Sequence, residues 1–136
     1  GIRHYMEETK EFCRSNEYVQ TIFGRKVHLP GISDKNGARR SFSERAAINA
    51  PIQGSAADII KRAMIRLPGE MKGAGLAGKM LLQVHDELIF EVPEKEAEES
   101  SKVIRQIMEN AAAPAIEMSV PLIVDAGIGD NWGEAH

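Results

Sequence analysis

Two short apolar segments separated by only three polar residues constrain the fold of this chain more than any other feature. They are residues 80–84 (MLLQV) and residues 88–92 (LIFEV), with His85-Asp86-Glu87 between them. Two β-forming runs with so short a break predict a tight antiparallel hairpin whose tip carries the polar residues. Such turns usually contain glycine or asparagine. Because an imidazole and two carboxylates replace them here, we suspect a functional site at the tip.

The carboxylates at this tip suggest metal-dependent chemistry. Oxygen ligands at the end of a rigid sheet suit Mg²⁺, a hard cation that keeps several of its waters. In phosphoryl transfer such ions activate the attacking hydroxyl and neutralise phosphate charge. Asp86 alone does not provide enough ligands to hold the ion, so a second aspartate would have to come from elsewhere. Two other interpretations stay open. One is an ordinary solvent-exposed turn, and the other is a metal-dependent hydrolase, which needs converging histidines. His4, His28 and His136 lie in unrelated segments.

The remaining patterns predict an α+β chain, with an antiparallel sheet made of hairpins and covered by helices. Helical spacing of apolar residues predicts a helix over residues 2–15. Alternation of β-forming residues predicts a short hairpin over residues 18–29. Residues 30–37 are rich in turn residues and should form a loop. A third helix should follow Pro93, with Ile104, Ile107, Met108 and Ala111 on its buried face, and a final strand should cover residues 120–124.

The second helix has the clearest end signals. Ser41 and Glu44 form a capping box, which places the helix start just after Ser41. Pro68-Gly69 should end it, and Pro51 should kink or break it, because proline lacks a backbone N–H and clashes with the preceding turn. The chain therefore divides into residues 1–40 (helix, hairpin and loop), 41–67 (kinked helix) and 79–136 (hairpin, helix and strand) within one domain of residues 1–136.

Three long polar side chains follow one face of this second helix. Arg45, Asn49 and Gln53 are spaced by four, so they lie in a row. Such groups can donate to the acceptors that every base pair presents in the minor groove of DNA. Arg39-Arg40, just upstream, could contact phosphates. The other interpretation is the ordinary hydrated face of a helix.

Composition is that of a folded protein, and the charge is unevenly distributed. Residues 1–67 hold 12 Lys and Arg against 7 Asp and Glu, whereas residues 68–136 hold 5 against 13. The first half could therefore face a polyanion, although the net charge of −3 argues weakly against nucleic acid and both halves could simply be hydrated surface. Cys13, the single cysteine, fits a buried helical position in a reducing compartment. No segment approaches the length of an apolar membrane span.

Several of these segments together resemble bacterial family A (polymerase I-type) DNA polymerases. The resemblance covers essentially the whole chain in order. It is carried by GR at 24–25, LP at 29–30, NGARR at 36–40, ERAAINAPIQGSAADIIK at 44–61, QVHDEL at 83–88, and NW and AH at 131–132 and 135–136. The long block and the VHDE block are specific in combination, whereas either alone would not be.

The resemblance implies roles for individual residues. Residues 84–87 correspond to the family's third motif, at the tip of a hairpin in the palm. Asp86 then corresponds to a catalytic metal ligand, Glu87 beside it has a supporting catalytic role, and His85 approaches the primer terminus. The helix from residue 41 adjoins the fingers, and its DNA contacts in the minor groove are Arg45, Asn49 and Gln53. Weaker candidates for contact with DNA or substrate are Gln83, Arg39 and Arg40.

The resemblance also implies an activity and its partners. An intact enzyme of this kind is a cytoplasmic, DNA-directed DNA polymerase of replication and repair. It extends a primer on primer–template DNA with dNTPs, using two Mg²⁺ ions. The family's first motif, with the other metal-binding aspartate, and its nucleotide-binding helix are not found here. We therefore expect a carboxy-terminal fragment that needs the remainder of the polymerase chain and is inactive alone. The alternative function is a stand-alone, non-catalytic DNA-binding module that uses the Arg45 face.

Overall fold

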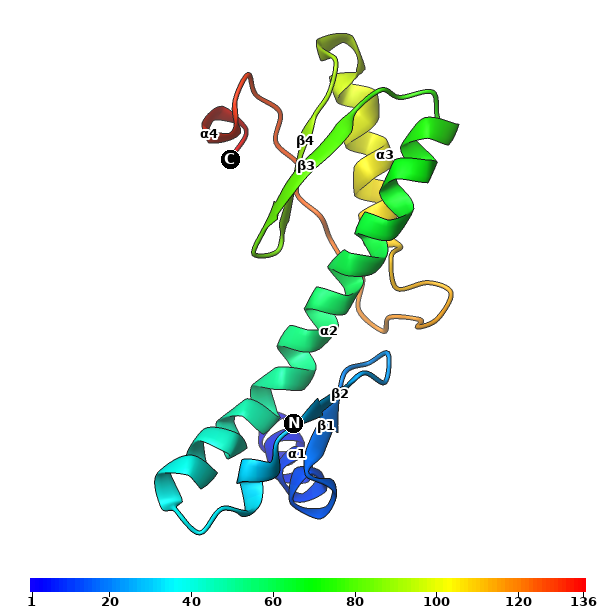
Figure 1. The fold of residues 1–136 in the computed structure, drawn as a ribbon. Helices are drawn as coiled ribbons and strands as arrows, with labels where there is room; N and C mark the ends of the chain where they lie inside the picture. Colours follow the sequence, from blue (N-terminus) through cyan, green and yellow to red (C-terminus); the bar gives the residue numbers. More distant parts are fainter. The chain divides into compact units, whose positions relative to one another are not determined.

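The computed structural model describes all 136 residues, and the chain divides into two compact units, Gly1–Asp58 and Ile59–His136. It confirms the α+β class, with two separate two-stranded antiparallel sheets rather than one sheet. The elements along the chain are α1 (Ile2–Asn16), β1 (Tyr18–Gln20), β2 (Lys26–His28), η1 (Pro30–Ser33), α2 (Gly37–Gly73), β3 (Lys79–Val84), β4 (Glu87–Glu91), η2 (Glu94–Glu96), α3 (Ala97–Glu109) and α4 (Trp132–Ala135) (Figure 1). No helix is both long enough and apolar enough to cross a membrane.

The first unit packs α1 and the β1–β2 hairpin beside the first part of α2 (Figure 1). Its core contains Cys13, Val19, Ile32 and Ala47, all buried. As expected for a core thiol, burial raises the pKa of Cys13, and the nearby charge of Glu17 adds to the effect. The unit is thus held by a small apolar centre contributed by each of its elements.

The end of α1 shows how local backbone geometry directs the chain into the first hairpin. Glu17 adopts a left-handed conformation with φ of 61°, and its N–H donates to the Cys13 carbonyl at 2.7 Å. A left-handed residue directly after the last turn is a common helix ending. The predicted end near residues 16–17 is therefore confirmed, and β1 begins at Tyr18.

The loop between β1 and β2 lies directly against α2. Gly54 permits this approach, because a Cβ atom there would lie 2.8 Å from Cγ2 of Thr21. The Ile22 N–H donates to Oγ of Ser55 at 2.9 Å, and Nε of Arg25 donates to Oδ1 of Asp58 at 2.8 Å. A close backbone approach, a hydrogen bond and an ion pair therefore fix the loop to the helix.

The ends of α2 differ from the expectation of residues 41–67. The helix begins at Gly37, because the side chain of Asn36 accepts from the N–H groups of Ala38 and Arg39 at 3.0 and 3.2 Å. This is the position of an N-cap, so the capping box predicted at Ser41 was wrong. The prediction that Pro68-Gly69 ends the helix was also wrong, since α2 continues past Pro68 to Gly73.

Neither proline interrupts α2. Ala47 and Ser55 are buried one turn before and one turn after Pro51, and Leu67 and Met71 are buried on either side of Pro68. An internal proline costs a helix about 3 kcal/mol, and burying one large apolar side chain contributes about 1.5–3 kcal/mol. Burial of Leu67 and Met71 therefore offsets the cost of Pro68. The side chains buried around Pro51, Ala47 and Ser55, are small and contribute less, and the hydroxyl of Ser55 donates to the Pro51 carbonyl. The predicted break at Pro51 does not occur, because α2 is continuous there, and the predicted kink stays a prediction.

The second unit packs the β3–β4 hairpin and α3 against the rest of α2 (Figure 1). Its buried centre is formed by Ala63, Leu67, Met71 and Ala111, surrounded by partly buried apolar residues of both strands and of α3. The predicted face of α3 is confirmed, since Ile104, Ile107 and Met108 pack on this centre. A short 3-10 turn, η2, lies between Pro93 and α3.

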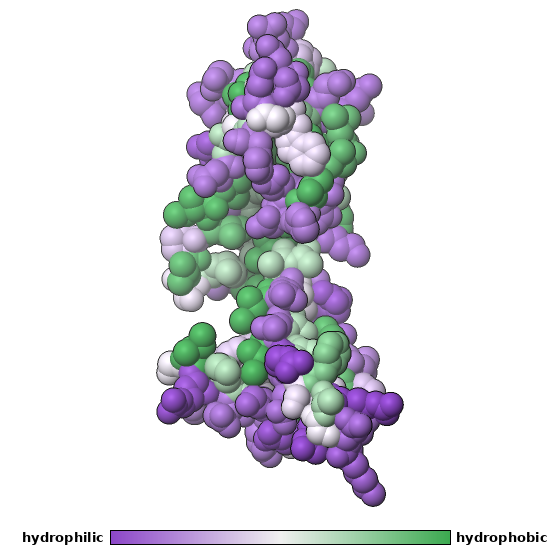
Figure 2. Space-filling view, turned by 90° about the vertical axis from the view of Figure 1, so that its left-hand side faces the viewer, coloured by the Kyte–Doolittle hydropathy of each residue, from purple (hydrophilic) through white to green (hydrophobic).

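The predicted final strand at residues 120–124 does not form. Pro121 lacks the N–H group that a strand residue would contribute to its ladder, which disfavours a strand here. Instead, the Val124 N–H donates to a carboxylate oxygen of Glu109 at 3.1 Å, and Ile123 is 77% exposed. Figure 2 shows that apolar side chains are exposed among hydrophilic ones on the face of the molecule in view.

The contact of Arg25 with Asp58 can be tested by its contribution to stability. The Asp58 side chain is only 15% exposed, so removing its cation leaves a largely buried carboxylate without that hydrogen bond. We expect Arg25→Ala to lower the free energy of unfolding by about 1–3 kcal/mol in urea titrations. Glu8→Ala is the matched control, because the His4–Glu8 pair is largely exposed. Loss of the His4–Glu8 ion pair should change the free energy of unfolding by less than about 0.5 kcal/mol. Equal effects of the two substitutions would contradict this account.

Candidate functional site

The turn between β3 and β4 is as short as an antiparallel hairpin allows. Val84 pairs with Glu87, so only His85 and Asp86 form the turn and Glu87 is already the first residue of β4. His85 has a positive φ of 54°. Two-residue turns of type II′ need a positive φ at their first position and usually have glycine there. A side chain in this conformation costs roughly 1–2 kcal/mol, so the histidine is not explained by folding.

The turn displays its polar groups to solvent. Gln83, His85 and Asp86 are exposed, and Glu87 is partly buried. The side-chain amide of Gln83 donates to the His85 carbonyl at 3.0 Å. Gln83 therefore supports the shape of the turn from within β3, in addition to any contact outside the chain. The three residues that the sequence placed at the tip, His85, Asp86 and Glu87, do lie together, and Gln83 adjoins them from β3.

One further residue at the turn was missed by sequence reasoning. Nδ1 of His136 lies 3.3 Å from a carboxylate oxygen of Glu87. The short helix α4 holds this part of the chain together, since Asn131 accepts from the Glu134 N–H at 3.0 Å and Glu134 accepts from the Asp130 N–H at 3.1 Å. No local signal marks such a long-range pair, so only a structure could find it.

The polar row on α2 is present as expected. Arg45, Asn49 and Gln53 are all exposed. Together with Phe42, Ala46 and Ala50 they line a shallow cavity of about 320 Å³ in the first unit. The two alanines contribute only small side chains to the cavity, and the three polar side chains supply its hydrogen-bond donors. Phe42 was not among the predicted residues, although its spacing from Arg45 places it on the same face.

Arg39 and Arg40 lie in the first turn of α2 and are exposed. Nη1 of Arg39 lies 3.7 Å from Oδ2 of Asp34, and Nη1 of Arg40 donates to the Asp34 carbonyl at 3.3 Å. These long contacts leave most of each guanidinium accessible. Both arginines belong to the same unit as the row of Arg45, Asn49 and Gln53.

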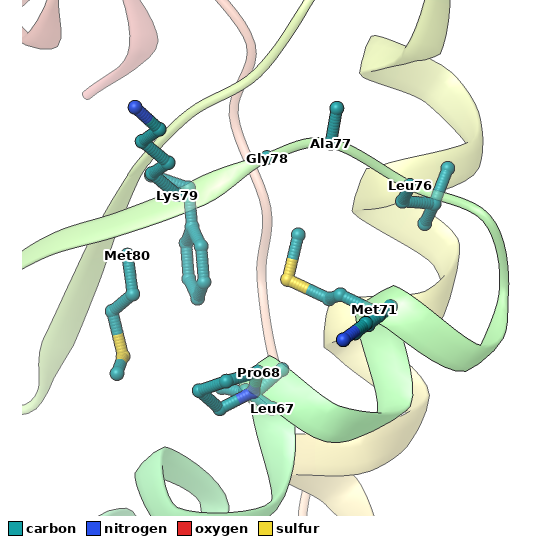
Figure 3. A pocket seen from close by; sticks show the side chains of 10 residues that line it. Leu67, Pro68, Met71, Leu76, Ala77, Gly78, Lys79 and Met80 are labelled. Carbon is teal, nitrogen blue, oxygen red and sulfur yellow. The ribbon is translucent and has the colours of Figure 1, made fainter.

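A cavity elsewhere in the second unit has no chemistry of this kind. It measures about 470 Å³ and lies between the last turns of α2 and the start of β3 (Figure 3). Met71 and Met80 extend into it from different elements, and Lys79 directs its ammonium group away. Apart from Lys72 and Lys79 its lining residues are apolar, and none is a carboxylate, so we place the candidate site at the turn and not in this cavity.

The turn offers oxygen ligands that suit a hard cation, but too few to complete a metal site. Carboxylate oxygens are the ligands that Mg²⁺ accepts, and Asp86 presents one group of this kind in solvent. The chain holds no cluster of three or more His, Cys, Asp or Glu side chains arranged to bind a metal. Asp86 can thus serve as one ligand of an ion whose other ligands come from substrate or from another segment.

Comparison with known proteins gives the family. The profile of DNA polymerase family A matches residues 1–134. DNA polymerase I of Rhizobium leguminosarum is 56% identical over 138 residues, which cover 100% of this chain and 14% of the relative. DNA polymerase I of Pseudomonas aeruginosa is 48% identical over 136 residues, which again cover 100% of this chain and 14% of the relative.

A solved structure agrees with these relatives. It is the POL domain of Pol1 from M. smegmatis in complex with DNA primer-template and dNTP. Its sequence is 46% identical, the TM-score is 0.90, and the match covers 98% of this chain and 23% of that one. The chain belongs to DNA polymerase family A. It spans 14% of the length of the two curated relatives named above.

The backbone of His85 can be tested separately from its side-chain chemistry. Glycine relieves the left-handed conformation but loses more entropy on folding. We therefore expect His85→Gly to leave the free energy of unfolding unchanged or to raise it by up to about 1 kcal/mol. Gly24→Ala is the control, because φ at Gly24 is 84° and alanine there should destabilise the protein. A large loss of stability in the His85 variant would show that the imidazole has a structural role.

Proposed function

We propose that this chain forms the catalytic hairpin of the palm and the adjoining fingers-side helix of a DNA-directed DNA polymerase. The observation that carries the proposal is the turn at residues 85–86, where a family A chain displays Asp86 in solvent beside a histidine held in a glycine-like conformation. The complete polypeptide would extend a primer on a template with dNTPs. The solved relative, described with primer-template DNA and dNTP, supports this substrate class.

In this proposal Asp86 is the catalytic carboxylate of the chain. Its oxygens would hold one side of a Mg²⁺ site, and the other protein ligand would come from a segment outside these residues. Mg²⁺ bound there would activate the primer hydroxyl and neutralise charge on the phosphates, in a reaction that uses two such ions. Pairing of Val84 with Glu87 fixes where the Asp86 side chain emerges from the sheet.

The residues next to Asp86 would position the reacting groups. The exposed imidazole of His85 would approach the primer terminus, and Gln83 would hold the turn through its bond to the His85 carbonyl. Glu87 would have a supporting catalytic role, with its carboxylate oriented by His136. Each of these assignments uses a side chain that already lies at the turn.

The first unit would hold the duplex. Arg45, Asn49 and Gln53 would donate to minor-groove acceptors near the new base pair, which tests the shape of the pair more than its sequence. Arg39 and Arg40 would contact phosphates and contribute affinity that falls as salt rises. The exposed row and the shallow cavity beside it support this assignment.

We further propose that the chain does not polymerise DNA in isolation. It spans 14% of the relative from Rhizobium leguminosarum and 23% of the solved polymerase domain. It also offers one exposed catalytic aspartate, whereas two-metal chemistry needs more carboxylate ligands. Activity assays should therefore use the complete polypeptide that contains this chain.

The decisive test is Asp86→Asn in that complete polypeptide. The amide keeps the shape of the side chain but removes its charge, so primer extension should fall by at least about two orders of magnitude. Affinity for primer–template DNA should stay within about threefold, because Asp86 is not among the DNA-contacting groups. Glu91→Gln, at the other end of β4, is the matched control and should extend primers normally. Near-normal synthesis by the Asp86 variant would refute the proposal.

A further inference from the structure

Phe42 is an exposed aromatic residue in a place where folding gives no reason for one. It lies in the second turn of α2 and is 66% exposed, although neighbouring Ser43 is buried. Single exposed apolar residues are common on protein surfaces. Phe42 differs from an ordinary case because of what surrounds it, and that setting points to a ligand.

The phenyl ring forms one end of the cavity that contains the polar row. Phe42, Arg45, Asn49 and Gln53 are spaced by three or four residues, so they follow one another along the same face of α2. All four line the same cavity of about 320 Å³. A ligand that touches the three polar side chains therefore also meets the ring.

The charge around this cavity selects a polyanion. Arg45 lies inside it, and Arg39 and Arg40 are exposed on the preceding turn of the same helix. The neighbouring carboxylate, Glu44, is turned toward Arg14, with 3.4 Å between Oε1 and Nη2. The face thus combines cations, amide donors and one flat apolar group.

Duplex DNA offers the matching set of groups. Its phosphates attract the arginines, and the floor of the minor groove presents acceptors to the amides. The walls of that groove are deoxyribose rings, whose carbon-bound hydrogens form an apolar surface. An aromatic ring fits such a surface, because it removes apolar area on both partners from water.

We propose that Phe42 packs against the deoxyribose wall of the duplex bound along the Arg45, Asn49 and Gln53 row. The residue then joins Arg45, Asn49 and Gln53 as a fourth contact from this cavity, one that contributes apolar area instead of charge or hydrogen bonds. This inference rests on the duplex-binding part of the proposed function and adds a positioning residue to it. It gives the affinity for DNA a component that salt does not weaken.

Salt dependence distinguishes this contact from a phosphate contact. The dissociation constant for a defined primer–template duplex would be measured by fluorescence anisotropy from low to high NaCl, using the complete polypeptide. Phe42→Ala should raise it about tenfold at every salt concentration, the scale expected from losing a partly buried aromatic group. The slope of log affinity against log salt should not change, because no counterion is involved. Arg40→Ala should instead reduce that slope by about one.

Two further variants make the test specific. Phe42→Leu retains most of the apolar contact and should bind DNA within about threefold of the parent. Ile52→Ala removes a side chain that is 60% exposed on the same helix but does not line the cavity, so its affinity should not change. Circular dichroism of each variant, with urea titration, checks that α2 remains folded.

The outcomes separate this inference from the proposed function. Unchanged affinity of Phe42→Ala, a slope that falls as it does for Arg40→Ala, or an equal effect of Ile52→Ala overturns the inference alone. So does a loss of stability in Phe42→Ala without a change in affinity, because it shows that the ring packs on protein. Absence of duplex binding by the parent overturns both. Normal synthesis by Asp86→Asn, with DNA binding weakened by Phe42→Ala, overturns only the catalytic proposal.

Discussion

Burial on both sides of two prolines is the constraint on which the rest of the structure depends. Both units pack on α2, so a helix that ended at Pro51 or at Pro68 would remove part of the core from one of them. Ala47 before the first proline and Leu67 before the second are fully buried. Burying a large side chain such as Leu67 contributes an energy comparable to the cost of a proline inside a helix, whereas burying the small Ala47 contributes less. Tertiary packing therefore overrides a strong local signal twice in one element.

The register of the β3–β4 hairpin has a similar importance for the site. A shift of one residue would turn each side chain to the opposite face of the sheet. Met80, Leu88 and Phe90 pack on the core of the second unit, which opposes such a shift. The same packing determines that Asp86 emerges at the tip. The apolar side of the hairpin thus positions its polar end.

Much of this arrangement could be predicted, and the failures have physical reasons. The hairpin at 80–92 and the row of Arg45, Asn49 and Gln53 follow from local periodicity, which can be read directly from the sequence. The start of α2 was misplaced because Asn36 and Ser41 are both good caps, and only the folded backbone decides between them. The contact of His136 with Glu87 depends on the path of an irregular segment, which no periodic pattern describes.

The left-handed backbone at the hairpin tip has an evolutionary consequence. Selection for folding alone favours glycine at that position, whereas an imidazole there satisfies no need of the hairpin itself. Under the proposed function, in which His85 approaches the primer terminus, stability and activity act on one codon in opposite directions. A gene copy released from its biochemical duty would be free to drift to glycine without harm to its fold. The identity of this single residue could then help to separate working members of a lineage from decaying duplicates.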